Sequence, residues 1–346
     1  MQHSITHARR DRQHQFRVRS GGSALLAFVL GLGYGSVTLN TAYALPGTPT
    51  VINGGPPANS ATFASTATTL TVTQLVPNLA LSWAPSGTGS TPTKAFDILS
   101  GETVTFIQPS VTSIAFNQIV CSGCSATQIA GTLQTQLSGS PGTVGGKVWL
   151  FDPNGIAIGT GAVVNVGGLL ASSLTADPAT WLANPNSALP INDGGGPTPT
   201  NGAVTNAGAI TASGTTGYVA LVGNSVDNAS GGTIDVGFGT VDLAAGRVAT
   251  VTALSGGGLN FALDLTSANA LANNNAAASY ASANEGSLSG AAVRLSANDA
   301  NAMFASGAVN TSGIIRAVNL DNSGGTITLT GVGDPVLASG TLNAAG

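Results

Sequence analysis

The sequence contains very few charged residues and, over most of its length, no histidine. Charged residues make up 7% of its 346 positions, whereas globular domains average about 25%. The three histidines are His3, His7 and His14. Histidine is the commonest general base and metal ligand in proteins. Its absence beyond position 14 removes Ser-His-Asp and Cys-His catalysis, and His-based zinc sites, from the candidate functions of that region.

Positive charge is concentrated at the amino terminus. Five of the ten basic residues lie there: Arg9, Arg10, Arg12, Arg17 and Arg19. An apolar run over residues 24–39 and the small residues Ala42 and Ala44 follow, which is the order of a secretory signal peptide. The run is short and rich in glycine, whereas a membrane span needs about 20 apolar residues. We therefore predict a signal peptide at residues 1–44 that is cleaved after Ala44.

Without that segment the chain is acidic. It keeps 5 basic and 13 acidic residues, which is a net charge of −8. Nucleic-acid binding depends on clustered Lys and Arg side chains that contact phosphates, so no nucleic-acid partner is predicted. The hydrophobic content of 42% argues against a disordered chain, because disordered sequences lack apolar residues to bury.

A short pattern of apolar residues, Asn or Thr, and Gly recurs along the chain. It occurs over residues 203–212, 225–236 and 308–317, and Val226 follows its counterpart Val204 after 22 residues. A strand-rich unit that repeats at this length is typical of stacked solenoids. The sequence therefore predicts an all-β fold, with a β-helix as the leading interpretation.

The pattern divides the chain beyond the signal into three regions. Residues 45–260 form the main region, in which residues 175–200 carry five prolines and predict a loop that stands off the stack. Residues 261–290 are rich in Ala, Asn and Ser and predict an interruption. Strand patterns resume over residues 291–346 without a capping repeat, which solenoids need. We therefore expect the chain to be the amino-terminal part of a longer protein.

Two further patterns make local predictions. Apolar residues recur every four positions over residues 126–137, which indicates a helix. Trp149 lies in an apolar run and is predicted to be a core residue, whereas Trp181 lies in the proline-rich segment and is a candidate surface contact.

The chain has one cysteine pair, Cys121 and Cys124. In an exported chain this spacing is compatible with a local disulfide or with two inert thiols. A metal site is disfavoured because it needs about four ligands and no nearby His or further Cys exists. A disulfide would close a very small loop, so we expect it to stabilise the fold only modestly.

The carboxylates Asp227, Asp235 and Asp242 follow strand patterns, and two interpretations of them remain open. They either solvate turns, where Asp is frequent, or act with Arg247 or Arg294 in a groove, as in β-helix polysaccharide lyases and hydrolases. The first interpretation is favoured because few basic residues remain. No glycine-rich segment has the context of a phosphate loop or the spacing of a calcium repeat, so no cofactor is predicted.

The sharpest turn in the sequence is Asp152-Pro153-Asn154-Gly155, between two apolar strand patterns. Asp at the first position, Pro at the second and Gly at the fourth are typical of a type I β-turn. The turn lies in a series of short segments with a fixed order: Leu45-Pro46-Gly47, Leu81-Ser82-Trp83, Phe96-Asp97-Ile98, Val104-Thr105-Phe106, Phe116-Asn117-Gln118-Ile119, Ser125, Ile129, Gly131, Val148-Trp149-Leu150, Pro153-Asn154-Gly155-Ile156, Gly159 and residues 169–174.

In order and spacing, these segments resemble the amino-terminal secretion domain of two-partner-secretion exoproteins. This is the filamentous-haemagglutinin and haemolysin group of Gram-negative bacteria, whose domain is also called the haemagglutination activity domain. Three features depart from the family pattern. Asp152 stands where the family usually has Asn, the cysteine pair is an addition, and the family's second element, Asn-Pro-Asn-Leu, is matched only in part by Asn184-Pro185-Asn186-Ser187.

The resemblance implies a right-handed parallel β-helix with extra-helical loops or hairpins and an N-terminal β cap. It also implies export through the periplasm, recognition by the POTRA domains of an outer-membrane β-barrel transporter, and release from the cell or display on its surface. Asp152, Pro153, Asn154 and Gly155 would form the secretion-motif turn. The domain would be non-enzymatic and would nucleate folding of a large adhesin-like protein, whose full length would carry any host-cell or carbohydrate receptor binding. A β-helix polysaccharide lyase or hydrolase, or a carbohydrate-binding surface protein, is the alternative.

Overall fold

A computed structural model of the chain describes residues 45–53, 59–85, 95–121, 123–194, 202–214, 216–271, 280–299, 306–318 and 324–345. The predicted signal peptide and its cleavage site after Ala44 lie outside these residues. Residues 42–346 form one compact unit. No helix in the described ranges combines the length and the apolar character that a membrane span requires.

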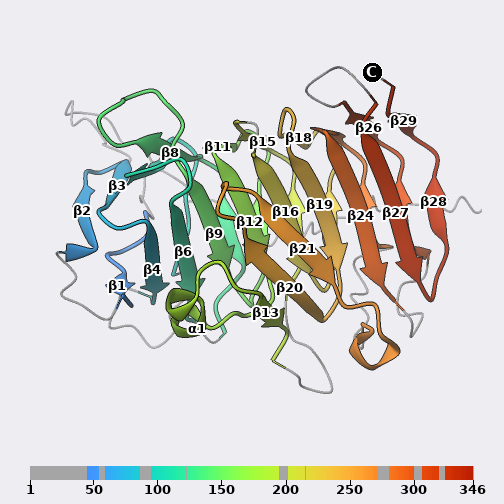
Figure 1. Cartoon of the computed structure of the whole chain (residues 1–346), viewed down its shortest axis with the longest axis horizontal. Helices are drawn as coiled ribbons and strands as arrows, with labels where there is room; N and C mark the ends of the chain where they lie inside the picture. The colour runs from blue at the N-terminus through green and yellow to red at the C-terminus, as the bar shows by residue number, and fades with distance from the viewer. Residues whose placement is uncertain are drawn as a thin grey trace, which may run out of the picture. The chain divides into compact units, whose positions relative to one another are not determined.

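Strands of the described residues form three long sheets and one small one (Figure 1). The nine-stranded sheet has the order β1 (Thr50–Val51), β4 (Asn78–Trp83), β6 (Ile114–Ile119), β9 (Lys147–Phe151), β12 (Gly168–Ser172), β16 (Tyr218–Gly223), β19 (Thr240–Ala245), β24 (Ala292–Asn298) and β27 (Thr326–Val332). The ten-stranded sheet has the order β2 (Ala61–Ser65), β3 (Thr69–Gln74), β5 (Thr103–Gln108), β8 (Thr132–Leu137), β11 (Val163–Val166), β15 (Ala209–Ala212), β18 (Thr233–Asp235), β23 (Ser287–Gly290), β26 (Ile314–Ala317) and β29 (Thr341–Asn343).

The other two sheets are smaller. The seven-stranded sheet has the order β28 (Val336–Ala338), β25 (Gly307–Thr311), β22 (Tyr280–Asn284), β17 (Val226–Asn228), β14 (Val204–Asn206), β10 (Ile156–Ile158) and β7 (Thr127–Ile129). The three-stranded sheet consists of β13 (Leu189–Asn192), β20 (Val248–Ala253) and β21 (Leu259–Leu263). A short α-helix, α1 (Pro178–Ala183), and a 3-10 turn, η2 (Ser267–Asn269), complete the described elements.

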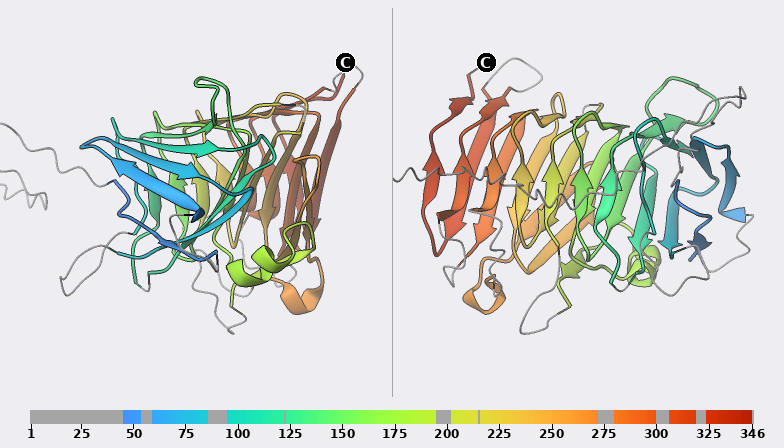
Figure 2. Two further views of the ribbon diagram at one scale, coloured as in Figure 1. Left: turned by 60° about the vertical axis from the view of Figure 1, so that its left-hand side comes forward. Right: turned by 180° about the vertical axis from the view of Figure 1, so that it is seen from behind.

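The chain runs through the seven-stranded, the ten-stranded and the nine-stranded sheet one after another, and this path repeats to form a coil whose three walls are the sheets. Strands β7, β8 and β9 make one turn of the coil, and β10, β11 and β12 make the next. Each strand pairs in parallel with its counterpart in the neighbouring turn of the coil. Figure 2 shows the turns stacked from the blue amino-terminal strands to the red carboxy-terminal ones. Val204 aligns with Val226, which confirms the 22-residue repeat and the β-helix interpretation.

The first strands close the amino-terminal end of the coil. Strand β2 pairs antiparallel with β3, and β1 pairs antiparallel with β4. These are the blue strands at one end of the stack in Figures 1 and 2. The expected N-terminal β cap is confirmed.

The nine-stranded sheet is buried on both faces along its middle. In β9, Val148 and Leu150 pack inside the coil, while Trp149 and Phe151 pack into a second apolar cluster on the outer face. The three-stranded sheet and α1 contribute the other side of this outer cluster. Burial on both faces explains why these strands read as continuous apolar runs rather than as alternating ones.

Residues 175–194, the described part of the proline-rich segment, pack against the coil instead of standing off it. They contain α1 and β13, and β13 pairs antiparallel with β20 from a later part of the chain. Trp181 of α1 is 1% exposed and its ring stacks on Phe116 at a centroid distance of 5.3 Å. The prediction that Trp181 is a surface contact is therefore wrong, because the outer face of β6 and β9 offers it an aromatic surface to cover. Trp149 is a core residue, as predicted.

The helix predicted over residues 126–137 is also wrong. The segment forms β7 and β8, separated by a corner at Gly131. A Cβ at Gly131 would lie 2.3 Å from the carbonyl oxygen of Leu99, so only glycine fits this corner. Ile129 and Leu133 both reach the core from two strands on either side of the corner, which produces the spacing of four without a helix.

Coil strands resume earlier than the composition indicated. Strands β22 and β23 lie within residues 261–290 and pair in parallel with β17 and β18. In β22, the small residues Ala281 and Ser282 are both fully buried. Because small side chains occupy these buried positions in place of Val, Ile or Leu, the segment lacks the large apolar residues by which a strand is recognised in a sequence.

A ladder of buried amides runs along the seven-stranded sheet. Asn206 Nδ2 donates to Asn228 Oδ1 and Asn228 Nδ2 donates to Asn284 Oδ1, each at 2.8 Å. Asn284 Nδ2 then reaches Thr311 Oγ1 at 3.3 Å. All four side chains are fully buried. The recurrent Asn or Thr of the sequence pattern is therefore an internal stacking position and not a solvated turn position.

We predict that Asn228→Ala destabilises the protein strongly. It removes the acceptor of Asn206 and the donor to Asn284, and each buried polar group left without a partner costs about 1–3 kcal/mol. Urea denaturation should show the free energy of unfolding lowered by about 2–4 kcal/mol. The control Asn260→Ala, at an exposed position of β21, should change it little. Equal losses for the two variants would show that the ladder contributes nothing.

Candidate functional site

The predicted turn connects β9 of the nine-stranded sheet to β10 of the seven-stranded sheet. Gly155 N donates to the Asp152 carbonyl oxygen at 2.9 Å, the hydrogen bond of a β-turn. Gly155 has a φ of +107°, which glycine adopts without strain. The local sequence therefore forms the turn that its residue types predict.

The Asp152 side chain organises this corner. It is 1% exposed. Its Oδ2 accepts hydrogen bonds from Thr127 N at 3.0 Å and Thr127 Oγ1 at 2.8 Å, and its Oδ1 accepts from Asn154 N and Nδ2, both at 2.9 Å. Burial raises the pKa of the Asp152 carboxyl, and the hydrogen bonds from Thr127 and Asn154 oppose that shift. The Asp152 carboxylate thus holds the β-turn of residues 152–155 against the preceding turn of the coil.

The remaining contacts fasten the corner on both sides. Asn154 Nδ2 donates to the Cys121 carbonyl oxygen at 3.0 Å, in the preceding turn. On the other side, Gly202 N donates to the Pro153 carbonyl at 2.8 Å and Ile156 N donates to the Ala203 carbonyl at 3.0 Å. The corner therefore fixes the register of three successive turns of the coil.

The two cysteines lie beside this corner. Cys121 and Cys124 form a disulfide in the structure, with Cα atoms 5.6 Å apart. The Cys121 carbonyl is the acceptor for Asn154, so the small disulfide loop and the turn share a contact. The sequence predicted the turn, left open whether the cysteines are bonded, and did not indicate that the two features meet.

The carboxylates weighed for catalysis do not converge. Asp227 lies in β17, Asp235 in β18 and Asp242 in β19. These three strands make one turn of the coil, and each belongs to a different sheet. The groove with paired carboxylates and a base, which the lyase interpretation requires, is therefore not formed by these residues.

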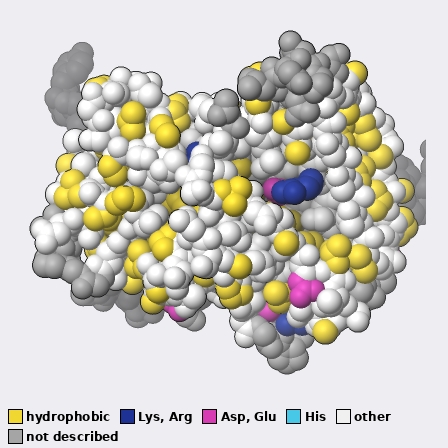
Figure 3. Space-filling model, in the orientation of Figure 1, with side chains coloured by type: hydrophobic (Ala, Val, Ile, Leu, Met, Phe, Trp, Pro, Cys, Tyr) yellow, Lys and Arg dark blue, Asp and Glu magenta, His cyan; other side chains and the backbone are white. Residues whose placement is uncertain are grey.

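The two candidate arginines are each held in an ion pair. Arg294 Nη2 donates to Asp242 Oδ2 at 2.9 Å, and Arg247 Nε donates to Asp193 Oδ2 at 2.6 Å. Figure 3 shows how few charged side chains lie on the face that it presents. Among the described residues, no cluster of three or more His, Cys, Asp or Glu side chains could hold a metal ion.

Lys147 and the pocket beside it were not indicated by the sequence. Lys147 begins β9 and is 3% exposed. It lines a cavity of 190 Å³ between the nine-stranded sheet and the hairpin that joins β20 to β21. No local pattern in the sequence shows that this distant hairpin covers the lysine.

We predict that Asp152→Ala lowers the free energy of unfolding at pH 7 by about 2–4 kcal/mol, because hydrogen bonds to a charged group contribute about 1.5–3 kcal/mol each. Asp152→Asn should cost less, since one oxygen remains to accept. Thermal and urea unfolding measure both. The matched control is Asp235→Ala, which removes one exposed hydrogen bond to Gly237 N. A similar loss in Asp152→Ala and in this control would contradict the role of the buried carboxylate.

A second prediction concerns Asp227. Its Oδ1 is buried without a hydrogen-bond partner among the described residues, and burial together with the nearby Glu285 carboxylate raises its pKa to about 6. Because the folded pKa exceeds the unfolded value, the wild type loses stability as pH rises from about 4 to about 6. Asp227→Asn should therefore raise the melting temperature at pH 7 and leave it unchanged below pH 4. A gain of equal size at both pH values would exclude titration as its cause.

Comparisons with known proteins identify the family and the fold. The family model named TPS secretion domain matches residues 91–344. Two relatives, both named heme/hemopexin-binding protein and both from Haemophilus influenzae, are 31% identical over 149 residues and 41% identical over 80 residues. These alignments cover 43% and 23% of this chain but only 14% and 7% of the relatives. The crystal structure of the HMW1 secretion domain from Haemophilus influenzae is similar with a TM-score of 0.54 and 21% identity, over 87% of this chain and 74% of that chain.

The family match spans most of the chain, and the structural similarity supports the same fold. Both the family resemblance and the fold predicted from the sequence are confirmed. The chain belongs to the TPS secretion domain family, the secretion domains of two-partner-secretion exoproteins of Gram-negative bacteria, and its fold is their right-handed parallel β-helix.

Proposed function

We propose that this chain directs export of an adhesin-like exoprotein by presenting its amino-terminal β-helix to a cognate outer-membrane β-barrel transporter. The periplasmic POTRA domains of that transporter are the proposed partner. Residues 1–44 act as a signal peptide that is cleaved after Ala44 in the periplasm, and the chain then reaches the cell surface or the medium. The domain performs no catalysis in this proposal.

The clamped corner at Asp152-Pro153-Asn154-Gly155 carries the proposal. Its contacts join the preceding turn, through Cys121 and Thr127, to the following turn, through Gly202 and Ala203. A corner with this connectivity suits a nucleus, because a stacked coil grows by adding turns to an existing template. Pro153 and Asn154 are partly exposed, so a partner can also contact them.

The separation of the candidate catalytic residues supports a non-enzymatic role. General acid–base catalysis needs groups within hydrogen-bond reach of one substrate atom, and Asp227, Asp235 and Asp242 lie on different sheets. The alternative of a polysaccharide lyase or hydrolase would need a different set of residues.

The proposal is tested by co-expressing the chain with its transporter and measuring it in the culture medium. Wild-type chain should appear there only when the transporter is present. Asn154→Ala combined with Gly155→Ala should reduce the amount to near background. The double change removes the contact with the Cys121 carbonyl, and its new Cβ at position 155 would lie 2.7 Å from the Ala203 carbonyl oxygen.

A matched control separates this corner from turns in general. Asp235→Ala combined with Gly237→Ala alters an exposed turn in which an Asp side chain likewise accepts from the backbone N–H two residues on, here Gly237 N, and should leave secretion unchanged. Circular dichroism of both purified variants shows whether they fold. Normal secretion of the Asn154/Gly155 variant, or release of the wild type without any transporter, would overturn the proposal.

A further inference from the structure

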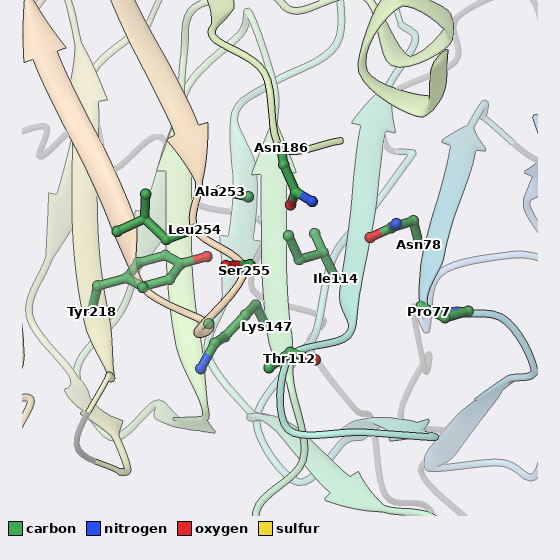
Figure 4. Close-up of a pocket in the computed structure, with 12 residues that line it drawn as sticks. Pro77, Asn78, Thr112, Ile114, Lys147, Asn186, Tyr218, Ala253, Leu254 and Ser255 are labelled. Carbon is green, nitrogen blue, oxygen red and sulfur yellow. The ribbon is translucent and has the colours of Figure 1, made fainter. Parts of the chain in front are cut away.

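The pocket that Lys147 lines extends across the first residues of neighbouring strands in the nine-stranded sheet. Its floor contains the first residues of successive strands, Asn78 of β4, Ile114 of β6 and Lys147 of β9, which align with one another in register. Its roof is the hairpin turn between β20 and β21, which includes Ser255 and Gly257. Figure 4 shows the floor and the roof enclosing the space between them.

The floor is shaped to bring a lysine and a tyrosine together. Gly168, the first residue of β12, aligns with Lys147. A Cβ at Gly168 would lie 2.9 Å from Lys147 Cδ and 2.9 Å from Tyr218 Cε1. The missing side chain therefore lets the ammonium of Lys147 sit 5.8 Å from the centre of the Tyr218 ring, a cation–π distance.

Among the described residues, no carboxylate forms an ion pair with the buried ammonium of Lys147. Its Nζ donates to the Gly167 carbonyl oxygen at 2.8 Å. Neither ion pair found among the described residues, Arg247 with Asp193 and Arg294 with Asp242, involves Lys147. A buried charge is unfavourable unless an opposite charge and hydrogen bonds compensate it. One carbonyl and one aromatic ring leave the remaining donors of the ammonium available for an anion.

Other polar groups of the pocket are also free to bind. Tyr218 is 1% exposed, and its hydroxyl accepts from Trp149 Nε1 at 2.7 Å. That hydroxyl keeps its own hydrogen to donate, and no acceptor for it lies among the described residues. In Figure 4 it points into the pocket, as do the side-chain amides of Asn78 and Asn186. None of the described residues that line the pocket carries a carboxylate.

We propose that this pocket binds a small hydroxy acid, whose carboxylate pairs with Lys147 and whose hydroxyl groups bond to Tyr218, Asn78 and Asn186. The cavity of 190 Å³ has the volume of about six water molecules, which suits a short hydroxy acid or the carboxylate end of an acidic sugar. Pro77 and Thr112, at its margin, are exposed and leave an entrance. This proposal does not depend on the secretion function.

Proton linkage gives the proposal a second signature. Burial lowers the pKa of Lys147 to about 8. Among the described residues, the Tyr218 phenol is the titratable group that faces it, and burial raises the pKa of that phenol, so it stays neutral. A bound carboxylate stabilises the charged lysine. Binding should therefore weaken as pH rises above 8, and it should take up a proton at that pH.

Isothermal titration calorimetry of the purified chain tests the proposal with four probes. D-Glycerate and D-glucuronate carry the carboxylate, and glycerol and D-glucose are their neutral counterparts. At pH 7 at least one acid should bind and both neutral compounds should not. The acid that binds distinguishes a free hydroxy acid from an acidic sugar. Near pH 8.5, the measured enthalpy should change with the ionisation enthalpy of the buffer.

Variants assign the binding to the pocket. Lys147→Met removes the charge while keeping an unbranched side chain only one atom shorter, and it should weaken binding about tenfold or more, as expected when one member of a buried charged pair is removed. Asn186→Leu, at an exposed position, should weaken it several-fold without altering the fold. The exposed Arg316→Met should bind as the wild type does.

Three results would overturn the proposal. They are equal binding of glucose and glucuronate, unchanged binding in Lys147→Met, and no binding of either acid at millimolar concentration. Near-UV circular dichroism, which reports the buried tryptophans, establishes that each variant is folded. If Lys147→Met does not fold, Asn186→Leu and the pH dependence of the wild type still decide the question.

Discussion

Every turn of this coil depends on the backbone edge of the turn beside it. The coil strands contain three to seven residues, and strands of that length are not stable alone in water. Parallel pairing gives each strand within the stack hydrogen-bond partners on both sides, and the register places like side chains above one another. The aligned valines of β14 and β17 and the Asn206–Asn228–Asn284 ladder are the apolar and polar forms of this stacking. A side chain in the interior is therefore selected by its neighbours along the stack.

One part of the fold cannot form in simple order along the chain. Strand β13 precedes β14 in sequence but pairs with β20, which follows β19. The ion pair between Asp193 and Arg247, 54 positions apart, fastens the same junction. The aromatic cluster of Phe116, Trp149 and Trp181 is thus covered by segments from two separate parts of the sequence. Helix α1 and β13 come before two further turns of the coil, and β20 and β21 come after them. Growth turn by turn explains the coil, whereas its outer layer requires a later, long-range closure.

The sequence predicted those features that local chemistry determines. The turn at Asp152–Gly155, the repeat from Val204 to Val226 and the core position of Trp149 each follow from residue types at fixed spacing, and the structure contains all three. The errors arise where distant segments decide. Spacing alone cannot distinguish a helix from two strands around the corner at Gly131. Trp181 is buried because Phe116, far away in sequence, offers it a surface.

Because charged residues are scarce in this protein, each buried charge calls for a structural or functional explanation. Asp152 is surrounded by four hydrogen bonds, and Arg247 and Arg294 each face a carboxylate. These groups are compensated within the fold, so structure alone explains them. Asp227 and Lys147 differ, because one carboxylate oxygen has no hydrogen-bond partner and the ammonium has no counterion among the described residues. Asp227 lies beside a like charge, Glu285, which makes it a local source of instability. Lys147 lies beside an open cavity lined by neutral donors, and for that reason its missing partner is best sought outside the chain.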